Sequence, residues 1–399
     1  MAEMLNTNEE LQQQLMAYAR GLDGGNTNRS HYDQYQDSLA LAGPQEVNWL
    51  VDQLMQDIPD LDRIKSLVAK FIRACGKSLD DHPAPNYPEN TLFSQLLIEN
   101  SQLTLCFQSM TPLIKQWYRS ARENLDQCFN PDQITGQIAG QTGELKELIT
   151  TTLQLLETHY TFLQNEVFPR FEQGPNPFRC VQLMWSIQDD VLHNGKAALD
   201  LLDKPQELQT CNETMGKFTL DAKSLIYREE KILFPVMFQM GLLTASETST
   251  AVKPDNPGVP DTSDSQAVFH CSTGSLTATQ LTALFKALPL DITFIDDTDR
   301  VQFFSETPDR IFPRSPGILG RKVEHCHPPK SLDRVIAIVD DLKSGKKDVV
   351  RFWLNHRGTM VLIEYRALRD DQGKYLGIME STQDITDIHE LTGEKRLED

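Results

Sequence analysis

The sequence predicts a protein of two parts, an all-α helical bundle followed by an α+β module. In the first part, between residues 44 and 243, apolar residues recur at intervals of three and four, the period of an amphipathic helix. In the second part, short runs rich in β-branched and aromatic residues are separated by turn residues, which is typical of antiparallel strands. At 399 residues and 39% hydrophobic residues, the chain is long enough for each part to bury its own core.

The composition changes along the chain and predicts the boundaries between elements. Segments such as "EVNWLVDQLM" and "LKELITTTLQLLETHYTFL" indicate helices, and the Pro-rich stretches "DDHPAPNYPEN" and "EQGPNPF" indicate breaks between antiparallel helices. A stretch rich in Ser, Thr, Pro, Asp and Gly follows and is typical of a linker. A short helix, "TATQLTALFKAL", then precedes strands such as "DITFID", "VVRFWL" and "YLGIMEST". We therefore predict an N-terminal helical or flexible segment over 1–40, the bundle over 41–243, the linker over 244–272, the α+β module over 273–388 and a C-terminal tail over 389–399.

Charge and cysteine usage narrow the classes of partner and compartment. The net charge of −19 argues against nucleic acid as a partner, because nucleic-acid binders need a cationic surface. The sequence contains no apolar run of membrane-spanning length, and its N-terminus lacks the features of a signal peptide, so no membrane association is expected. The seven cysteines are scattered without a CxxC pair, which is typical of reduced thiols. We expect a cytoplasmic protein.

One helical sequence motif, called the Phe-Pro phrase below, occurs twice in the predicted bundle. The copies are "HYTFLQNEVFPRF", residues 159–171, and "YREEKILFPVMF", residues 227–238, which align on their Phe-Pro pairs. An iron pair inside a bundle needs histidine nitrogens and carboxylate oxygens that converge from several helices. His159 of the first copy and Glu229 and Glu230 of the second are candidates for such a site. If a metal is retained, we expect His159 and Glu230 to be ligands that point into one cavity.

The helical region of about residues 45–243 resembles the hemerythrin-type HHE cation-binding family, in a branch that carries a PAS domain after the helices. The resemblance rests on a His-Pro pair, a Glu-Asn pair and the words "HYTFLQNEVFP", "MWSIQDDVL" and "EEKILFP". It implies that the bundle binds iron, as one or two ions. The metal ligands that the resemblance implies are His82, Glu99, His159, Glu229 and Glu230.

Three positions depart from the pattern of that branch. Gln164 stands in place of a glutamate, Gln188 in place of a histidine, and Leu225 where HHE proteins often have histidine. An oxygen-bridging iron pair usually needs more nitrogen donors than two histidines supply. A two-iron centre, a single iron, zinc or manganese ion, and a scaffold that has lost its metal all stay open.

The C-terminal module, residues 273–386, resembles the PAS domain that follows the helical region in the same branch. The matching words include "LPLDITFIDDTDRVQFFS", "RKVEHCHPPKS" and "GKYLGIMESTQDITDI". PAS domains enclose heme, flavin or a small metabolite between sheet and helices, or form dimers without a ligand, and the resemblance implies one of these roles. The cysteine motif of photoactive flavin domains is missing.

Three consecutive residues before Pro328-Pro329 are candidates for binding heme or a metal in the module. A cysteine or histidine beside a proline turn is suited to be an axial ligand of heme iron, although the three side chains of an extended segment do not all face one ion. The alternative is a rigid turn whose prolines start the helix "SLDRVIAIVDDL". The candidate residues are His325, Cys326 and His327.

Together these observations predict a sensor or regulatory protein that is not an enzyme. A ligand of the bundle or of the PAS domain would change the relation between the two parts through its differential affinity. The chain has no Walker or Rossmann glycine motif and no kinase region, so its output passes to an unknown signalling protein or to a second copy bound through the PAS domain. The alternative is a metal-dependent oxidoreductase or hydrolase that uses His159, Glu229 and Glu230 around one ion.

Overall fold

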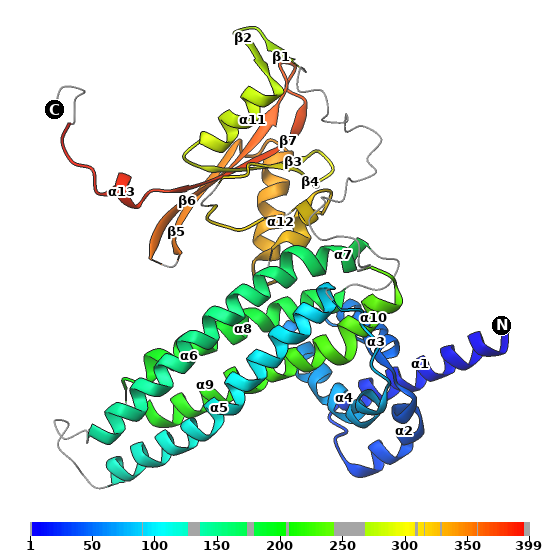
Figure 1. Ribbon diagram of the computed structural model, residues 1–399. Helices are drawn as coiled ribbons and strands as arrows, with labels where there is room; N and C mark the ends of the chain where they lie inside the picture. The colour runs from blue at the N-terminus through cyan, green and yellow to red at the C-terminus, as the bar shows by residue number, and fades with distance from the viewer. Residues whose placement is uncertain are drawn as a thin grey trace. The chain divides into compact units, whose positions relative to one another are not determined.

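The computed structural model divides the chain into two compact units, Met1–Ser249 and Thr250–Asp399. The division falls inside the predicted linker, most of which lies outside the described residues. Figure 1 shows the helices of the first unit and the sheet of the second. The described residues are 2–89, 91–126, 136–173, 179–204, 207–242, 268–307, 310–314, 316–327, 329–356 and 358–394.

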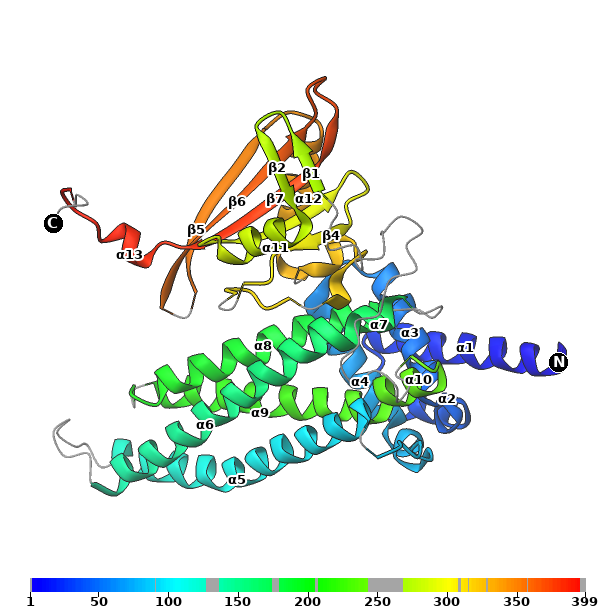
Figure 2. The same cartoon turned by 45° about the horizontal axis from the view of Figure 1, so that its top comes forward.

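The first unit is built from helices, as predicted. These are α1 (Ala2–Asp23), α2 (Arg29–Leu41), α3 (Pro44–Asp57), α4 (Leu61–Asp81), α5 (Leu92–Asp126), α6 (Gly136–Phe162), α7 (Phe168–Gln173), α8 (Arg179–Leu201), α9 (Leu208–Arg228) and α10 (Phe234–Gln239). Helices α5, α6, α8 and α9 form a closed ring in which each packs against two neighbours, and Figures 1 and 2 show them side by side. The interior of this ring is the place where the predicted site must lie.

The N-terminal helices α1 and α2 share the core of the bundle. Leu15, Ala19 and Leu22 of α1 are buried in the same apolar cluster as Phe107 and Phe168. Their spacing of four and three residues places them on one face of α1. The predicted boundary at residue 40 therefore does not separate two structural parts, because an apolar face on α1 packs onto the bundle.

Both copies of the Phe-Pro phrase contain a π-helical turn, η2 (Leu163–Val167) in the first and η4 (Glu229–Leu233) in the second. In each copy the N–H of the phenylalanine, Phe168 or Phe234, donates to the carbonyl five residues earlier. The following proline has no N–H, and its ring would clash with the carbonyl four residues earlier in a regular α-helix. The wider π turn relieves this clash. The repeat in the sequence is thus also a repeat in the backbone.

The second unit is an α+β module, as predicted. Its strands are β1 (Val268–Cys271), β2 (Gly274–Thr277), β3 (Asp291–Asp296), β4 (Val301–Phe304), β5 (Val349–His356), β6 (Thr359–Arg369) and β7 (Tyr375–Asp384). Its helices are α11 (Ala278–Ala287), α12 (Pro329–Lys343) and α13 (Thr386–His389), with 3-10 turns η5 (Pro316–Ile318) and η6 (Val323–Cys326).

Five of these strands form one antiparallel sheet in the order β4-β3-β7-β6-β5, with α12 packed on β6 and β7. This confirms the predicted antiparallel sheet and places β7 at its centre. Strands β1 and β2 form a separate hairpin that begins at Val268, inside the segment predicted as linker. Strands of four residues are too short for their alternation to stand out from a polar segment.

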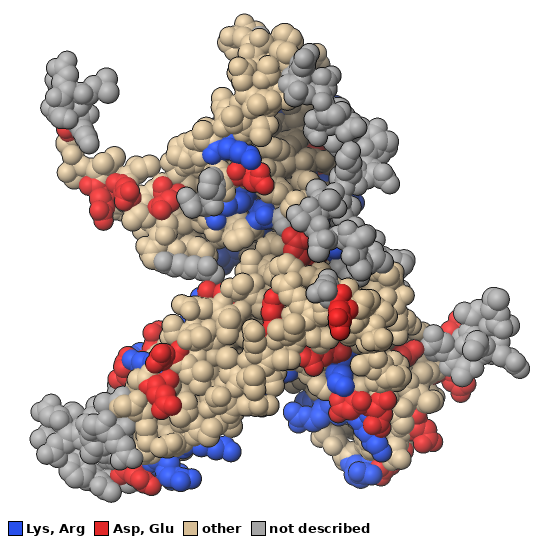
Figure 3. Space-filling view, in the orientation of Figure 1, with Lys and Arg blue, Asp and Glu red and all other residues tan. Residues whose placement is uncertain are grey.

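Two surface properties bear on the expected partners. None of the helices in the described ranges combines the length and the apolar character needed to cross a lipid bilayer. On the face drawn in Figure 3, the Lys and Arg side chains of the helical unit lie among Asp and Glu side chains. This face presents mixed charge.

Candidate functional site

The helical bundle contains a hydrogen-bonded chain of three ionisable residues, of which His159 and Glu229 are buried and Glu99 is partly exposed. His159, near the end of α6, lies with its Nδ1 2.8 Å from Glu99 Oε2 on α5. Its Nε2 lies 3.0 Å from Glu229 Oε2 on η4. His159 is 3% exposed and Glu229 is fully buried. The chain therefore joins three helical elements inside the core.

In this hydrogen-bonded chain, the positive charge of the imidazole and the negative charges of the carboxylates stabilise each other. Burial by itself lowers the pKa of His159, but Glu229 and Glu99 outweigh it and raise that pKa to about 9. The hydrogen bond from His159 in turn lowers the pKa of Glu99. An ionised carboxylate only accepts hydrogen bonds, so an imidazole with a carboxylate on each nitrogen must donate from both. The arrangement fits a protonated His159 at neutral pH.

Glu230 lies beside this chain and does not contact His159. Burial raises the pKa of Glu230, and the neighbouring charge of Glu229 raises it further, while the Asn100 amide on α5 opposes the shift. The η4 residue that is hydrogen-bonded to His159 in the structure is Glu229. Joint binding of a metal by His159 and Glu230 stays a prediction.

Two glutamines form a second polar contact in the bundle. Gln164 of η2 donates from Nε2 to Gln188 Oε1 of α8 at 2.8 Å. Gln188 is fully buried, as is Leu225 on α9. Several other buried side-chain atoms of the bundle have no hydrogen-bond partner: Asn100 Nδ2 and Oδ1, Tyr160 Oη, Ser186 Oγ, Gln188 Nε2 and Glu229 Oε1.

His82 is placed apart from the other predicted ligands. It is the C-cap residue of α4, and its ring packs against the backbone at Gly43, just before α3. The structure thus joins Glu99, His159 and Glu229 by hydrogen bonds and puts Glu230 next to them. It does not join His82 to this set by any contact among the described residues.

The donors in the bundle do not fit the two-iron centre that the resemblance implies. An iron pair needs several imidazole nitrogens and bridging carboxylates, whereas this interior has one imidazole whose nitrogens both face carboxylates. In the described ranges, no three His, Cys, Asp or Glu side chains gather closely enough to hold one ion. A single ion would have to displace a hydrogen bond of His159.

The inner face of the PAS-like sheet carries a polar row at its centre. The register pairs Glu380 of β7 with Thr293 of β3 on one side and with Tyr365 of β6 on the other. Phe304 and Val350 continue the row at its two ends. Thr293, Glu380 and Tyr365 are all buried. A carboxylate therefore lies buried in the middle of the sheet, on the side covered by helices.

His327 is the one predicted cofactor residue whose pKa responds to the charge of Glu380 in this row. Its Nδ1 donates to the Val323 carbonyl at 2.9 Å, which leaves Nε2 free to accept. Burial lowers the pKa of His327, and the charge of Glu380 opposes that shift. Burial and the same carboxylate raise the pKa of Tyr365.

The other two predicted cofactor residues point elsewhere. Cys326 is buried in the apolar core of the second unit, with its Sγ 3.5 Å from the Lys322 carbonyl. His325 lies 3.6 Å from Glu324 near the surface. A heme macrocycle needs an apolar slot, whereas His327 faces charged groups. The surroundings of His327 suit a small polar ligand better than heme.

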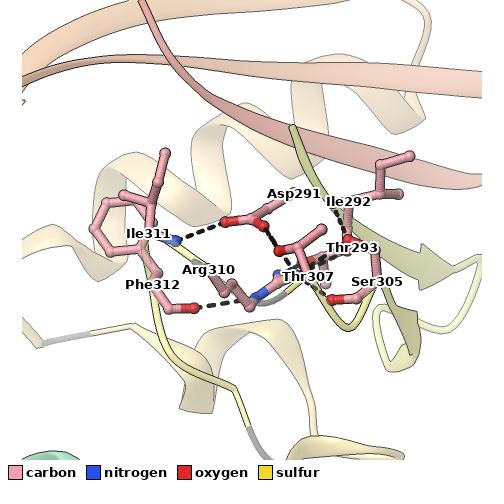
Figure 4. Close-up of polar contacts among 8 residues, drawn as sticks. All are labelled: Asp291, Ile292, Thr293, Ser305, Thr307, Arg310, Ile311 and Phe312. Carbon is pink, nitrogen blue, oxygen red and sulfur yellow. Dashed lines mark hydrogen bonds and ion pairs between the residues drawn. The ribbon is translucent and has the colours of Figure 1, made fainter. Parts of the chain in front are cut away.

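Arg310 fastens the segment after β4 to the start of β3, as Figure 4 shows. Its Nε donates to the Phe312 carbonyl at 3.1 Å, and its Nη1 to the Ser305 carbonyl at 2.7 Å. Its Nη2 donates to Thr293 Oγ1 at 2.9 Å. One guanidinium therefore holds both ends of the segment against the polar row.

Asp291, the first residue of β3, is also hydrogen-bonded to the segment after β4. It accepts hydrogen bonds from the Ile311 N–H, at 2.8 Å, and from the Thr307 hydroxyl. Its carboxylate also lies 3.9 Å from Arg310 Nη1. Burial lowers the pKa of Arg310, and Asp291 and Glu380 oppose that shift.

Arg310→Ala is expected to lower the free energy of unfolding of the second unit by roughly 2 kcal/mol or more, because it leaves several part-buried acceptors without donors. Chemical denaturation followed by hydrogen-exchange mass spectrometry of peptides from β3 and β7 measures the change in the second unit. Arg334→Ala on the exposed side of α12 is the matched control and should have little effect. Equal losses in the two variants would contradict this role of Arg310.

Acidification is expected to destabilise the second unit through His327. Burial holds the pKa of folded His327 below the ordinary 6.5, so below that pH the unfolded chain binds more protons than the folded one. Stability should therefore fall as the pH drops below about 6.5. Thermal unfolding in a series of neutral to mildly acidic buffers measures the slope. His327→Gln should flatten it, and an unchanged slope in this variant would exclude His327 as the cause.

Sequence reasoning missed Thr293, Glu380, Tyr365 and Arg310. The signal for the first three was the alternation of "DITFID", "VLIEYRAL" and "YLGIMEST", which assigns every second residue to one face. That alternation shows which residues share a face of one strand. It does not give the register that brings the three strands into one row.

Comparisons with known proteins find similarity in the second unit. A family model described as PAS domain matches residues 281–386. The chain is similar to the C-terminal domain of a Streptococcus mutans protein, with 34% identity over 32% of this chain and 100% of that one and a TM-score of 0.31. It is also similar to the PAS domain of a Colwellia psychrerythraea protein, with 13% identity over 27% of this chain and 97% of that one and a TM-score of 0.23.

No curated protein matches the chain. The family match does not extend to the helical unit, whose resemblance to the HHE family stays a prediction. The polar row of Thr293, Glu380 and Tyr365 falls inside the matched range. The second unit of this chain therefore contains a PAS domain, at residues 281–386.

Proposed function

We propose that the protein is a sensor or regulatory protein whose input is a small polar molecule bound on the inner face of the PAS sheet. The observation that carries this proposal is Glu380, a carboxylate 6% exposed at the centre of the domain. A buried carboxylate is costly unless it is paired or hydrogen-bonded, and such groups are concentrated at functional sites. Structural stability alone would favour an apolar residue at this position.

The groups around Glu380 define the chemistry of the ligand. Glu380 and His327 Nε2 accept hydrogen bonds, while the Tyr365 hydroxyl donates. Arg314 adds a cation whose buried Nε has no hydrogen-bond partner. A molecule with a donor group for Glu380 and an acceptor group for Arg314 satisfies both sides. The ligand is a small molecule that carries donors and acceptors close together.

A ligand at this position regulates by binding, without a chemical step. It favours one conformation of the domain over another through its differential affinity, and so changes the equilibrium between the two states. The output goes to a signalling protein or to a second copy of the chain. The exposed apolar side chains of Trp353, Ile388 and Leu391 offer contact area for either.

The test begins with native mass spectrometry of the full chain. The wild-type protein is expected to carry a co-purified small molecule, and Glu380→Gln is expected to lose it. Ser381→Ala changes the neighbouring residue on the opposite face of β7 and should retain the ligand. Hemin and FMN serve as added probes, and neither should raise the unfolding temperature.

Hydrogen exchange then checks the location. The co-purified molecule should slow exchange in β3 and β7 of the wild type and leave the Glu380→Gln variant unchanged. A wild-type protein that carries no small molecule, or a molecule that the Glu380→Gln variant retains in full, would contradict the proposed site.

A further inference from the structure

We infer that the helical unit has exchanged the metal centre implied by its resemblance for a hydrogen-bonded polar core, and that it folds and holds its shape without a metal ion. The inference concerns the bundle and does not depend on the PAS ligand. It rests on what now occupies the positions of the missing donors and on how the remaining donors are used.

The first missing donor has become part of the apolar core. In the repeated phrase, Leu225 holds the place that His159 holds in the first copy. Leu225 is fully buried and belongs to the main apolar cluster. One of the two imidazole positions of the repeat therefore contributes packing energy in place of a nitrogen ligand.

The second and third missing donors are joined by one hydrogen bond. Gln164 and Gln188 stand where the branch has a glutamate and a histidine, and they come from η2 and α8. The Gln164 amide donates to the Gln188 carbonyl at 2.8 Å. Two former ligand positions thus form one neutral contact between helices, of the kind that a shared ion would otherwise provide.

The surviving donors are also used within the protein. Each ring nitrogen of His159 faces a carboxylate, Glu99 at 2.8 Å and Glu229 at 3.0 Å. An ion bound to either nitrogen would have to break one of these hydrogen bonds. The hydrogen bonds of His159 link α5, α6 and η4, and the Gln164–Gln188 hydrogen bond links η2 and α8. These elements line the interior of the bundle.

Relative to the HHE pattern, the bundle has fewer negative charges as well as fewer metal ligands. A buried cluster of carboxylates needs cations close by, and a bound metal ion supplies them. A chain that loses the metal must also lose anionic ligands, or its core is left with uncompensated charge. Glutamine at position 164 removes one such charge while keeping the shape of the side chain.

The test uses the full chain, purified and analysed for metals by inductively coupled plasma mass spectrometry. We expect far less than one ion per chain. Thermal unfolding in EDTA, in zinc chloride, in manganese chloride and in anaerobic ferrous sulfate should give the same midpoint. A stoichiometric ion that Glu229→Gln loses, or a wild-type midpoint that falls in EDTA, would overturn the inference.

A second measurement examines the amide pair. Gln188→Ala removes the hydrogen bond that the Gln164 amide donates to Gln188 and is expected to lower the midpoint by several degrees, in EDTA and in the metal salts alike. Gln209→Ala is the matched control, because Gln209 forms an exposed amide contact with Glu213. A loss seen in the Gln188 variant only when metal is present would count against a metal-free core.

Discussion

His159→Gln is expected to lower the free energy of unfolding of the helical unit by about 3–5 kcal/mol, because removing one partner of a buried ion pair leaves the other charge uncompensated. Glu229 is fully buried and has its hydrogen bond to His159 at 3.0 Å. Its other oxygen, Oε1, has no partner. Urea denaturation followed by far-ultraviolet circular dichroism measures the loss.

The double variant His159→Gln with Glu229→Gln is the control for this prediction. It removes the buried charge together with its partner and leaves neutral groups of similar size. We expect it to be more stable than the single His159→Gln variant, since buried ion pairs are often replaced by neutral groups at little cost. A double variant as unstable as the single one would mean that His159 acts through packing alone.

The triple variant Gln164→Glu, Gln188→His and Leu225→His is expected to bind more iron than the wild-type chain. It restores the carboxylate and the two nitrogen donors that the sequence lacks relative to the HHE pattern. Iron content measured after anaerobic loading should rise toward two ions per chain, in line with the stoichiometry of a two-iron centre. Exposure to oxygen should then produce the visible absorption bands of an oxo-bridged pair.

Leu225→His alone is the control for the triple variant. It introduces an imidazole into a fully buried apolar position without other new ligands. We expect it to destabilise the bundle and to bind no iron. A triple variant that folds and stays free of iron would show that the repeated phrase serves packing only, and the PAS domain would then be the sole sensor.

The helical bundle was predictable because its signal is local. The period of apolar residues in α5, α6, α8 and α9 depends on neighbours three and four positions away, which the sequence contains in full. The same holds for the strands of the sheet, whose alternation appears in "DITFID" and "YLGIMEST". The hairpin of β1 and β2 escaped prediction, because short strands in a polar segment carry little of this signal.

The candidate sites were only partly predictable. His159, Glu99 and Glu229 were proposed from the sequence, and the structure brings all three into one hydrogen-bonded chain. The sequence did not show that Glu229, of the two adjacent glutamates, would be hydrogen-bonded to His159. His327 was proposed as one of three candidates, but its neighbour Glu380 lies 53 positions along the chain and was not.

The helices and strands of this protein follow from its sequence alone, because helix and strand periods and the turns between them are properties of adjacent residues. The roles of the polar residues inside these elements depend on how the chain folds. Gln164 and Gln188 are ordinary glutamines in the sequence and become hydrogen-bonded once η2 packs against α8. Glu380 is an ordinary strand residue and becomes a buried carboxylate once the register sets it between Thr293 and Tyr365. The free energy of a buried polar group depends on the partners that the fold brings to it, and those partners are distant in the sequence.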